Sequence, residues 1–388
     1  MYNFDFYNPT KIFFGKDRLD VIDGQVPVNA NVLITYGGGS AVRSGLIAKV
    51  KASLGSRKVV EFGGIEPNPQ YTTLMKAVEV VRSEKIDYVL AVGGGSVIDG
   101  TKFITLAANY KGVGSDLLKF SFGGVPREVV SQTTPFGAVL TLPATGSEMN
   151  DGAVISYEHG KFAVMCDLSY PKFSILDPQV TYTLPKIQVA NGIVDAFVHT
   201  TEQYITFPVD AKIQDRWAES ILLTLIEIGK INVEEPENYD ARANLVWSAT
   251  MALNGIIGVG IPQDWATHMI GHELTAKFGI DHGQTLAIVY PAVLDIMRVQ
   301  KQAKLLQYAE RVWNITTGST DEKIDKAIQK TIDFFESLGI KTKLSQYGVR
   351  KEEIGDIINQ LEAHEMTKLG ETQEITLEVS RKILEKAF

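Results

Sequence analysis

The sequence has very little cysteine and no apolar segment of membrane-spanning length. Its single cysteine, Cys166, excludes a disulfide within the chain and is typical of a reducing compartment, and its apolar neighbours favour a buried structural role over that of a nucleophile. Residues 1–10 lack a basic segment followed by an apolar run, and no apolar stretch is long enough to span a bilayer. We therefore expect a cytoplasmic protein without a membrane partner.

An excess of positive charge is also absent. The chain has 38 Lys and Arg residues against 46 Asp and Glu residues, a net charge of −8, which provides no basic surface for nucleic acid. At 388 residues with 45% hydrophobic and 22% charged residues, it is long and apolar enough to form two folded domains. The composition is thus that of an ordinary folded protein, and it is compatible with a mildly acidic enzyme that has a locally positive site.

The first half alternates two kinds of pattern. Apolar runs at residues 31–36, 58–61 and 87–92 predict strands, and the helical periods at about 42–54 and 71–84 lie between them. Strands that are apolar throughout are typical of a parallel sheet covered on both faces.

The second half is helical. Helical periods occupy about 188–205, 211–228, 241–257 and 265–278, and several more follow from residue 302 to the end. The sequence therefore predicts an α/β domain over residues 1–185, with a Rossmann-like parallel sheet, followed by an all-α domain over residues 186–388.

Two predicted strands are each followed by the same glycine-rich sequence, GGGS, at 37–40 and at 93–96. Such turns can bring backbone N–H groups and a helix N-terminus against a phosphate, although glycines also serve simply to make tight turns. Two of them in one α/β domain favour a dinucleotide. The three-glycine pattern of dinucleotide sites is incomplete, because Ile98 occupies its third position. A hydroxyl-rich segment at 141–148 and Lys161 could add further phosphate contacts, or Lys161 could be a solvated hairpin residue.

The first of these turns also indicates which dinucleotide binds. It has no acidic residue that would bond a ribose 2′-hydroxyl and repel a 2′-phosphate, and Arg43 follows within one helical turn. This pattern favours NADP(H) over NAD(H).

Histidines and an aspartate are spaced along the predicted helices of the second half. Asp195 and His199 are four residues apart, as are His268 and His272, and His282 follows a turn. Side chains at this spacing share a helix face, and an acid with several imidazoles from different helices suits a divalent transition metal. Polar pairs at this spacing are also common on helix surfaces, but Asp195 and His199 stand among apolar residues. His159 and His364, in polar surroundings, are not expected to take part.

Several segments together resemble the iron-containing (group III) alcohol dehydrogenase family. They are NPTKIFFG at 8–15, GGGSVID at 93–99, PATGSE at 143–148, Asp195-x3-His199 and His268-x3-His272-x9-His282-Gly283. QDWATH at 263–268 and GHEL at 271–274 look most like the bacterial NADPH-dependent aldehyde reductase and butanol dehydrogenase branch.

The resemblance implies roles for individual residues. Asp195, His199, His268 and His282 would bind one divalent metal, Fe²⁺ or Zn²⁺, and His272 would be a proton relay beside the reacting group. It also implies a small aldehyde or alcohol as substrate, an active site between the two domains, and a homodimer. The positions that match cofactor contacts are Gly38, Gly39, Ser40, Gly94, Gly95, Ser96, Asp99, Thr141, Thr145, Ser147, Lys161 and Tyr182.

The predicted function is hydride transfer between NADP(H) and a small aldehyde or primary alcohol, with the metal as Lewis acid on the substrate oxygen. One alternative is a dehydroquinate-synthase-like lyase that uses NAD and a metal. That chemistry needs several basic residues around an anionic substrate, and segments 193–202 and 261–282 contain only Lys277. The other alternative is a non-catalytic protein that binds a nucleotide or a metal.

Overall fold

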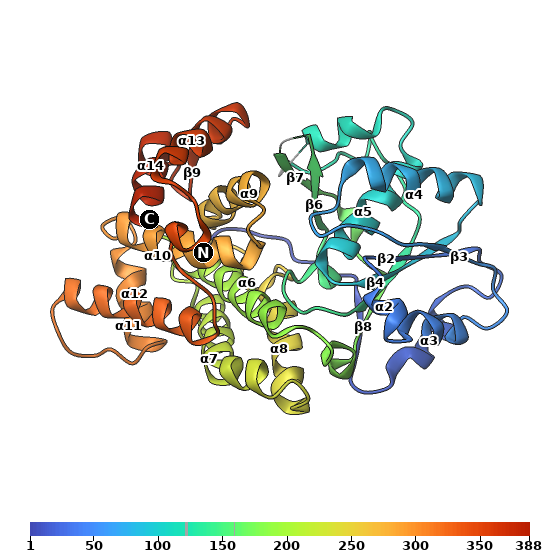
Figure 1. Cartoon of the computed structure of the whole chain (residues 1–388), viewed down its shortest axis with the longest axis horizontal. Coiled ribbons are helices and arrows are strands. Elements are labelled where there is room, and N and C mark those ends of the chain that lie inside the picture. The colour runs from blue at the N-terminus through green and yellow to red at the C-terminus, as the bar shows by residue number, and fades with distance from the viewer. Residues whose placement is uncertain (121–122, 159) are drawn as a thin grey trace. The chain divides into compact units, whose positions relative to one another are not determined.

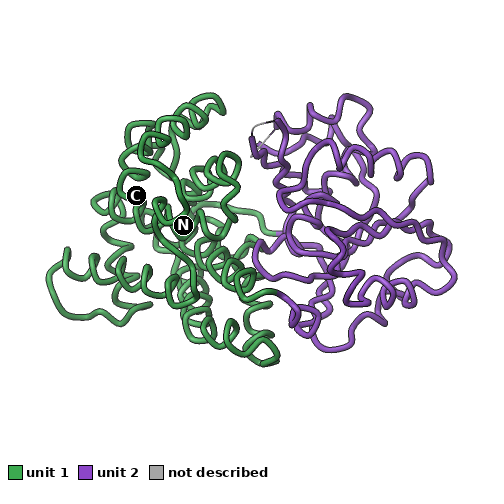
Figure 2. The backbone as a smooth tube through the Cα atoms, viewed as in Figure 1, with its two compact units in different colours: residues 1–6, 185–388 green, residues 7–184 purple. Residues whose placement is uncertain are grey.

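The structure is a computed structural model of the whole chain, and it describes residues 1–120, 123–158 and 160–388. His159, for which no role is expected, lies outside these residues. The chain forms two compact units, residues 7–184 and residues 1–6 together with 185–388 (Figure 2). The helical unit includes the first six residues because, for example, the Tyr2 backbone N–H donates to the Gly260 carbonyl at 2.8 Å.

The unit of residues 7–184 is built around a six-stranded, fully parallel sheet (Figure 1). The predicted parallel sheet is therefore confirmed. Its strands in spatial order are β1 (Lys11–Phe14), β8 (Phe173–Leu176), β5 (Phe136–Leu140), β4 (Tyr88–Gly93), β2 (Val32–Tyr36) and β3 (Val59–Phe62).

Helices cover both faces of this sheet. On one face, Val32 and Ile34 of β2 pack in a buried cluster with the apolar side of α3 (Leu46–Ser53). On the other, the Thr35 hydroxyl lies 2.7 Å from that of Thr101 in α5 (Gly95–Asn109). Burial on both sides explains why these strands are apolar throughout. α4 (Tyr71–Ser83) packs beside α5, and β6 (Gly152–Tyr157) and β7 (Gly160–Met165) form an antiparallel hairpin.

Three predicted helices differ from the observed ones, and the one predicted over 211–228 continues to Glu234 as α7 (Lys212–Glu234). The period over 42–54 corresponds to α2 (Ser40–Arg43) and α3, which are separated at Gly45, where φ is 74°. Glycine reaches this left-handed conformation without steric cost, so the helix breaks there. The helix predicted over 241–257 ends earlier, as α8 (Tyr239–Ala252), before Gly255 with a φ of 93°.

The helical unit contains long helices as predicted. α6 packs against α7 and α10, and α9 packs against α10 and α13. Apolar side chains from α9, α10, α13 and α14 form one buried cluster. The helices are α6 (Lys186–Tyr204), α7 (Lys212–Glu234), α8, α9 (Ala266–Phe278), α10 (His282–Ile296), α11 (Gln302–Arg311), α12 (Thr320–Ser337), α13 (Ile354–Ala363) and α14 (Leu377–Lys386).

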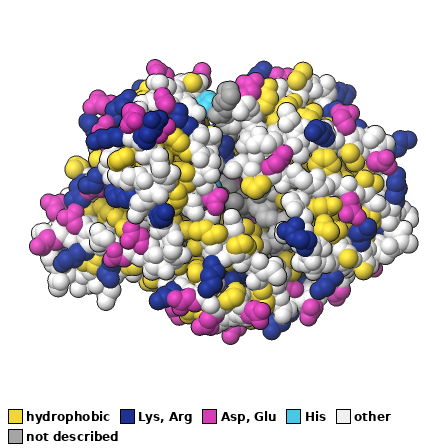
Figure 3. Space-filling model, in the orientation of Figure 1, with side chains coloured by type: hydrophobic (Ala, Val, Ile, Leu, Met, Phe, Trp, Pro, Cys, Tyr) yellow, Lys and Arg dark blue, Asp and Glu magenta, His cyan; other side chains and the backbone are white. Residues whose placement is uncertain are grey.

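The surface carries charges of both signs. On the face drawn in Figure 3, Lys and Arg side chains are interspersed with Asp and Glu side chains over both units. Within the described ranges, no helix combines the length and the apolar character needed to cross a bilayer.

Candidate metal and cofactor sites

The candidate metal site begins on α6, the helix at the centre of the helical unit. Asp195 and His199 lie one turn apart on this helix, and they are 3% and 4% exposed. The Asp195 Oδ1 atom is 3.6 Å from His199 Nδ1. The predicted shared face is therefore present, and it points into the protein interior, where polar groups need partners.

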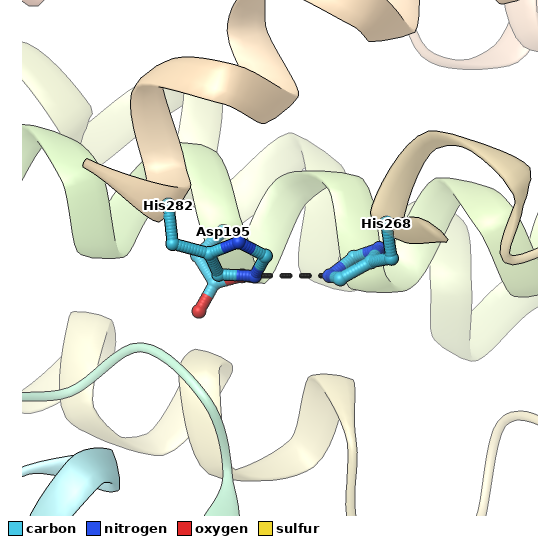
Figure 4. A group of neighbouring side chains, drawn as sticks. All are labelled: Asp195, His268 and His282. Atoms are coloured by element: carbon cyan, nitrogen blue, oxygen red, sulfur yellow. Dashed lines mark ion pairs between the residues drawn. The ribbon is translucent and has the colours of Figure 1, made fainter. Parts of the chain in front are cut away.

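Two further helices bring imidazoles to the same carboxylate. His268 belongs to the first turn of α9 and His282 is the first residue of α10, and each places Nε2 3.6 Å from Asp195 Oδ1. One ligand atom from each of Asp195, His268 and His282 lies within 4.8 Å of the other two (Figure 4). Side chains far apart in the sequence thus converge, as the pattern of acid and imidazoles predicts.

This geometry fits a divalent cation. Ligand atoms at about 2.0–2.2 Å from a tetrahedral Zn²⁺ are separated from one another by roughly 3.4 Å. The three distances of 3.6 Å are close to that separation, and they are too long for normal hydrogen bonds. Within the described part of the chain, neither His199 Nδ1 nor His268 Nε2 has a hydrogen-bond partner, although both atoms are buried. Such atoms are costly unless something binds them, so the residues present fit a metal ion.

The electrostatics of the two buried imidazoles differ. Burial lowers the pKa of His199 to about 4, so this ring is neutral at pH 7 and can act as a ligand. Burial alone would also lower the pKa of His268, but the carboxylate of Glu202 and then that of Asp195 outweigh it and raise this pKa to about 9. A metal that binds His268 would therefore displace a proton from its imidazole ring.

His199 and His272 lie beside the three converging atoms. The His199 ring stacks on that of His268 with ring centroids 4.5 Å apart, but His199 does not join the set of ligand atoms that all lie within 4.8 Å. The ring of His272 is buried, with its centroid 5.1 Å from that of His282 and 6.2 Å from that of His268. The structure thus places both rings beside those of the converging histidines, with His199 Nδ1 at 3.6 Å from Asp195 Oδ1.

The sequence reasoning missed two acidic partners of histidines. Glu202, on α6, contacts His268 Nδ1 through one carboxylate oxygen and is 1% exposed. Its spacing of seven from Asp195 and three from His199 puts it on the same face of α6, a signal present in the sequence. His364, for which no role was expected, contacts the buried Glu273 carboxylate at 2.8 Å.

The second glycine turn lies at the start of α5. An ideal Cβ on Gly95 would be 2.4 Å from Thr145 Oγ1, and one on Gly94 would be 2.9 Å from Leu142 Cβ. Only glycine therefore allows the hydroxyl-rich segment at 141–148 to approach this helix N-terminus. The Thr141 backbone N–H also donates to the Gly93 carbonyl at 3.0 Å. The predicted cofactor residues Gly94, Gly95, Thr141 and Thr145 are thus brought together.

Polar side chains extend this group. The Ser147 hydroxyl donates to one oxygen of Asp99 at 2.5 Å, and the Val154 N–H donates to the other at 2.9 Å. Asp99 therefore holds Ser147 and the start of β6 in place, and burial raises its pKa against the effect of Lys102. Nearby, Asn68 accepts from Lys161 Nζ at 2.8 Å, and its N–H donates to the Ser96 hydroxyl at 3.3 Å.

The first glycine turn lies after β2. Gly39 has a φ of 94° and precedes Ser40 at the start of α2. Arg43 Nη1 lies 3.3 Å from the position that a Cβ on Gly39 would take, so the guanidinium folds back over the turn. Two predicted contacts remain. Gly38 directly precedes Gly39 in this turn, and Tyr182 follows the short 3₁₀ helix Pro178–Thr181 after β8.

Two family models match the chain. The iron-containing alcohol dehydrogenase model matches residues 9–178, and the model of the C-terminal region of Fe-containing alcohol dehydrogenases matches residues 189–388. Together they cover both structural units.

Individual relatives match over the full length. The chain is 58% identical to the NADPH-dependent aldehyde reductase YqhD of Escherichia coli K12 over 389 residues, covering 100% of both. It is 38% identical to NADH-dependent butanol dehydrogenase A of Clostridium acetobutylicum, again over 100% of both. The crystal structure of E. coli K-12 YqhD superposes with a TM-score of 0.97 at 57% identity, over 100% of this chain and 99% of that one.

Proposed function

This chain belongs to the iron-containing alcohol dehydrogenase family, and we propose that it reduces small aldehydes with NADPH, or oxidises the corresponding primary alcohols, at a metal site formed by Asp195, His199, His268 and His282. The family defines it as an oxidoreductase. The 58% identity to an NADPH-dependent aldehyde reductase supports both the cofactor and the substrate class.

One observation carries the proposal, the convergence of three imidazole nitrogens at 3.6 Å from a single carboxylate oxygen in the protein interior. When bound there, Fe²⁺ or Zn²⁺ supplies Lewis-acid polarisation of a substrate carbonyl, which makes its carbon a better hydride acceptor. Asp195 contributes the negative charge of the site, and the low pKa of His199 keeps that ring in its neutral form.

His272 is proposed as the proton relay. Its ring lies next to that of His282, and none of its atoms is among the three candidate ligand atoms of Asp195, His268 and His282. We therefore propose that it exchanges a proton with a substrate oxygen at this site. Reduction of an aldehyde to an alcohol requires one proton in addition to the hydride, and an imidazole suits this role near neutral pH.

The sheet-containing unit is proposed to bind the cofactor, which supplies the hydride. The N-terminus of α5 follows the turn at Gly94 and Gly95, and it offers backbone N–H groups to the diphosphate. Arg43, folded over Gly39, is proposed to pair with a 2′-phosphate, which supports NADPH over NADH.

The lyase alternative is disfavoured by the family matches and by the place of Lys277. This lysine, the one basic side chain in the segments that supply the ligands, pairs with Asp356 at 2.7 Å. It is thus engaged elsewhere and leaves no basic group in these segments for an anionic substrate. The family models likewise describe alcohol dehydrogenases.

We also propose that the protein works as a homodimer in the cytoplasm. Ile213, Trp217 and Ile231 are 56%, 42% and 37% exposed, and their spacing places them on one face of α7. Trp247 on the adjacent α8 is 42% exposed. Apolar surface of this kind favours association with a second copy. The single buried Cys166 agrees with a reducing compartment.

The test is elemental analysis of the purified protein followed by an aldehyde panel. We expect about one Fe or Zn per chain and steady loss of NADPH absorbance with short aldehydes, at a higher kcat/KM than with NADH. A protein that holds metal and NADPH but turns over no aldehyde would instead support the non-catalytic alternative.

A further inference from the structure

The second ring nitrogen of His268 faces a buried acid. Nε2 of this ring lies 3.6 Å from Asp195 Oδ1, in the candidate metal site, while Nδ1 contacts a carboxylate oxygen of Glu202. The other oxygen of Glu202 accepts the backbone N–H of Thr267 at 2.7 Å. One carboxylate on α6 therefore holds both the imidazole and the backbone beside it.

Asp264 fixes the same helix start from the other side. Its Oδ1 accepts the Ala266 N–H at 3.0 Å, and its own N–H donates to the Glu202 carbonyl at 2.9 Å. Between them, Trp265 has a φ of 65°, a left-handed conformation that costs about 1–3 kcal/mol for a bulky residue. The contacts of Glu202 and Asp264 hold the backbone in this conformation, and it leads directly into the turn that carries His268.

Asp264 is in turn anchored by a buried ammonium. Lys301 is 2% exposed, and its Nζ lies 2.9 Å from Asp264 Oδ2 and 2.7 Å from Glu371 Oε1. It also donates to the Ile205 carbonyl at 3.0 Å, at the end of α6. Buried charges that are paired and fully hydrogen-bonded have well-defined positions. The support of α9 thus extends to Glu371, in the C-terminal segment.

We propose that Glu202 is a positioning residue, which orients the His268 ring and fixes its tautomer so that Nε2 faces the metal. A ring that donates its Nδ1 proton to a carboxylate keeps the Nε2 lone pair free and becomes a stronger donor to a cation. This inference rests on the proposed metal site, and it assigns to Glu202 an effect on metal affinity without direct contact with the metal.

The first test compares zinc affinities of the whole protein after removal of its metal, by competition with a chromophoric chelator. Glu202→Gln keeps the size of the side chain and removes its charge, and we expect it to bind Zn²⁺ about 10–100-fold more weakly than the wild type. The matched control is Glu219→Gln, another buried acid, whose carboxylate contacts Tyr204, Arg216 and Arg311 instead of His268. It should bind Zn²⁺ as the wild type does. Equal affinity of Glu202→Gln and the wild type would overturn the inference.

The second test needs no change at Glu202 and so does not depend on the folding of a variant. In the zinc-loaded wild type, ¹⁵N NMR of labelled histidines should show His268 with a proton on Nδ1 and the metal on Nε2. The His268 signals are assigned by through-bond correlation to its backbone resonances, because His268→Ala is itself expected to lose the metal. The opposite arrangement, or a His268 ring that exchanges between orientations, would overturn the role of Glu202. A wild type that binds no zinc at all would instead contradict the proposed metal site, so the two failures are distinguishable.

Discussion

The backbone of Gly283 lies against that of Asn191. A Cβ on Gly283 would be 2.5 Å from the Asn191 carbonyl oxygen and 2.8 Å from its Cα. The Asn191 side chain also donates to Asp281 at 2.9 Å, just before α10 begins. Asn191 stands one helical turn before Asp195, and Gly283 follows His282 directly. The close approach of α6 and α10 at this point therefore brings His282 to within 3.6 Å of Asp195.

Gly283→Ala should separate these helices. The methyl group would meet backbone atoms that cannot rotate away, and overpacking of this kind costs about 1–3 kcal/mol. We expect the free energy of unfolding, measured with urea, to fall by that amount, and the Zn²⁺ affinity to fall with it because His282 moves away from Asp195. Retention of both values would show that the contact does not position His282.

Gly355→Ala is the matched control for that variant. Gly355 lies within α13, and a Cβ there would meet nothing within 4 Å. Alanine in a helix is more stable than glycine by about 0.5–1 kcal/mol, so this variant should gain stability and keep its Zn²⁺ affinity.

Much of the candidate site could be predicted from residue types and spacing. Asp195 and His199 stand one turn apart among apolar residues, and this pattern alone indicates a buried polar pair that needs a partner. What periodicity could not supply is the pairing between helices. That Glu202 contacts His268 depends on how α6 crosses α9, and acidic residues on helices usually face solvent.

In the fold, too, some features follow from residue patterns along the chain and others depend on how the chain packs. The apolar strands that end in glycines correctly predicted the parallel sheet of residues 7–184. The break of a predicted helix at Gly45 escaped prediction because the apolar period continues through it, while the chain takes a left-handed turn. Similarly, nothing in the sequence around Glu371 distinguishes it from a solvent-exposed acidic residue. Its carboxylate nevertheless pairs with the buried Lys301, which lies 70 residues away in the sequence.

His268→Ala and His272→Ala should separate metal binding from proton transfer. Loss of the His268 ring removes one of the three atoms that converge within 4.8 Å, so that variant should lose its metal. His272→Ala should keep its metal and lose turnover, by about 10²–10⁴-fold for a lost general acid or base. Elemental analysis and kcat with saturating aldehyde measure the two effects. A metal-free His272→Ala protein would argue against the relay and make this residue a ligand.

Arg43→Ala should change the choice of cofactor. A charge-assisted hydrogen bond contributes about 1.5–3 kcal/mol, so its loss should lower kcat/KM for NADPH roughly 10–100-fold and leave that for NADH nearly unchanged. Arg43 is a better site for this test than Gly39, whose φ of 94° would strain any replacement. Lys49→Ala, an exposed cation on the neighbouring α3, controls for general electrostatic attraction. An equal loss with both cofactors would place Arg43 away from the 2′-phosphate.

Lys102 should make stability depend on pH. Its Nζ is buried beneath the hairpin, where it donates to Asn150 Oδ1 and the Gly152 carbonyl, both at 2.7 Å. Burial lowers its pKa from 10.5 to about 8, against the opposing effect of Asp99. The folded chain thus releases this proton near pH 8, whereas the unfolded chain keeps it until about pH 10.5. Between these values the unfolded state binds more protons, so stability must rise with pH.

The expected gain from Lys102 is about 2 kcal/mol between pH 8 and 10, since one unit of pKa corresponds to about 1.4 kcal/mol. Urea unfolding of the wild type and Lys102→Met measures it as a difference in pH dependence, in which the contributions of other groups largely cancel. Lys76→Met, an exposed lysine on α4, should follow the wild type. The absolute stability of Lys102→Met does not decide the matter, because Asn150 and Gly152 lose a donor in that variant. If its pH dependence matches that of the wild type, Lys102 keeps its proton throughout this range, and Asp99 and its acidic neighbours outweigh the burial of the ammonium.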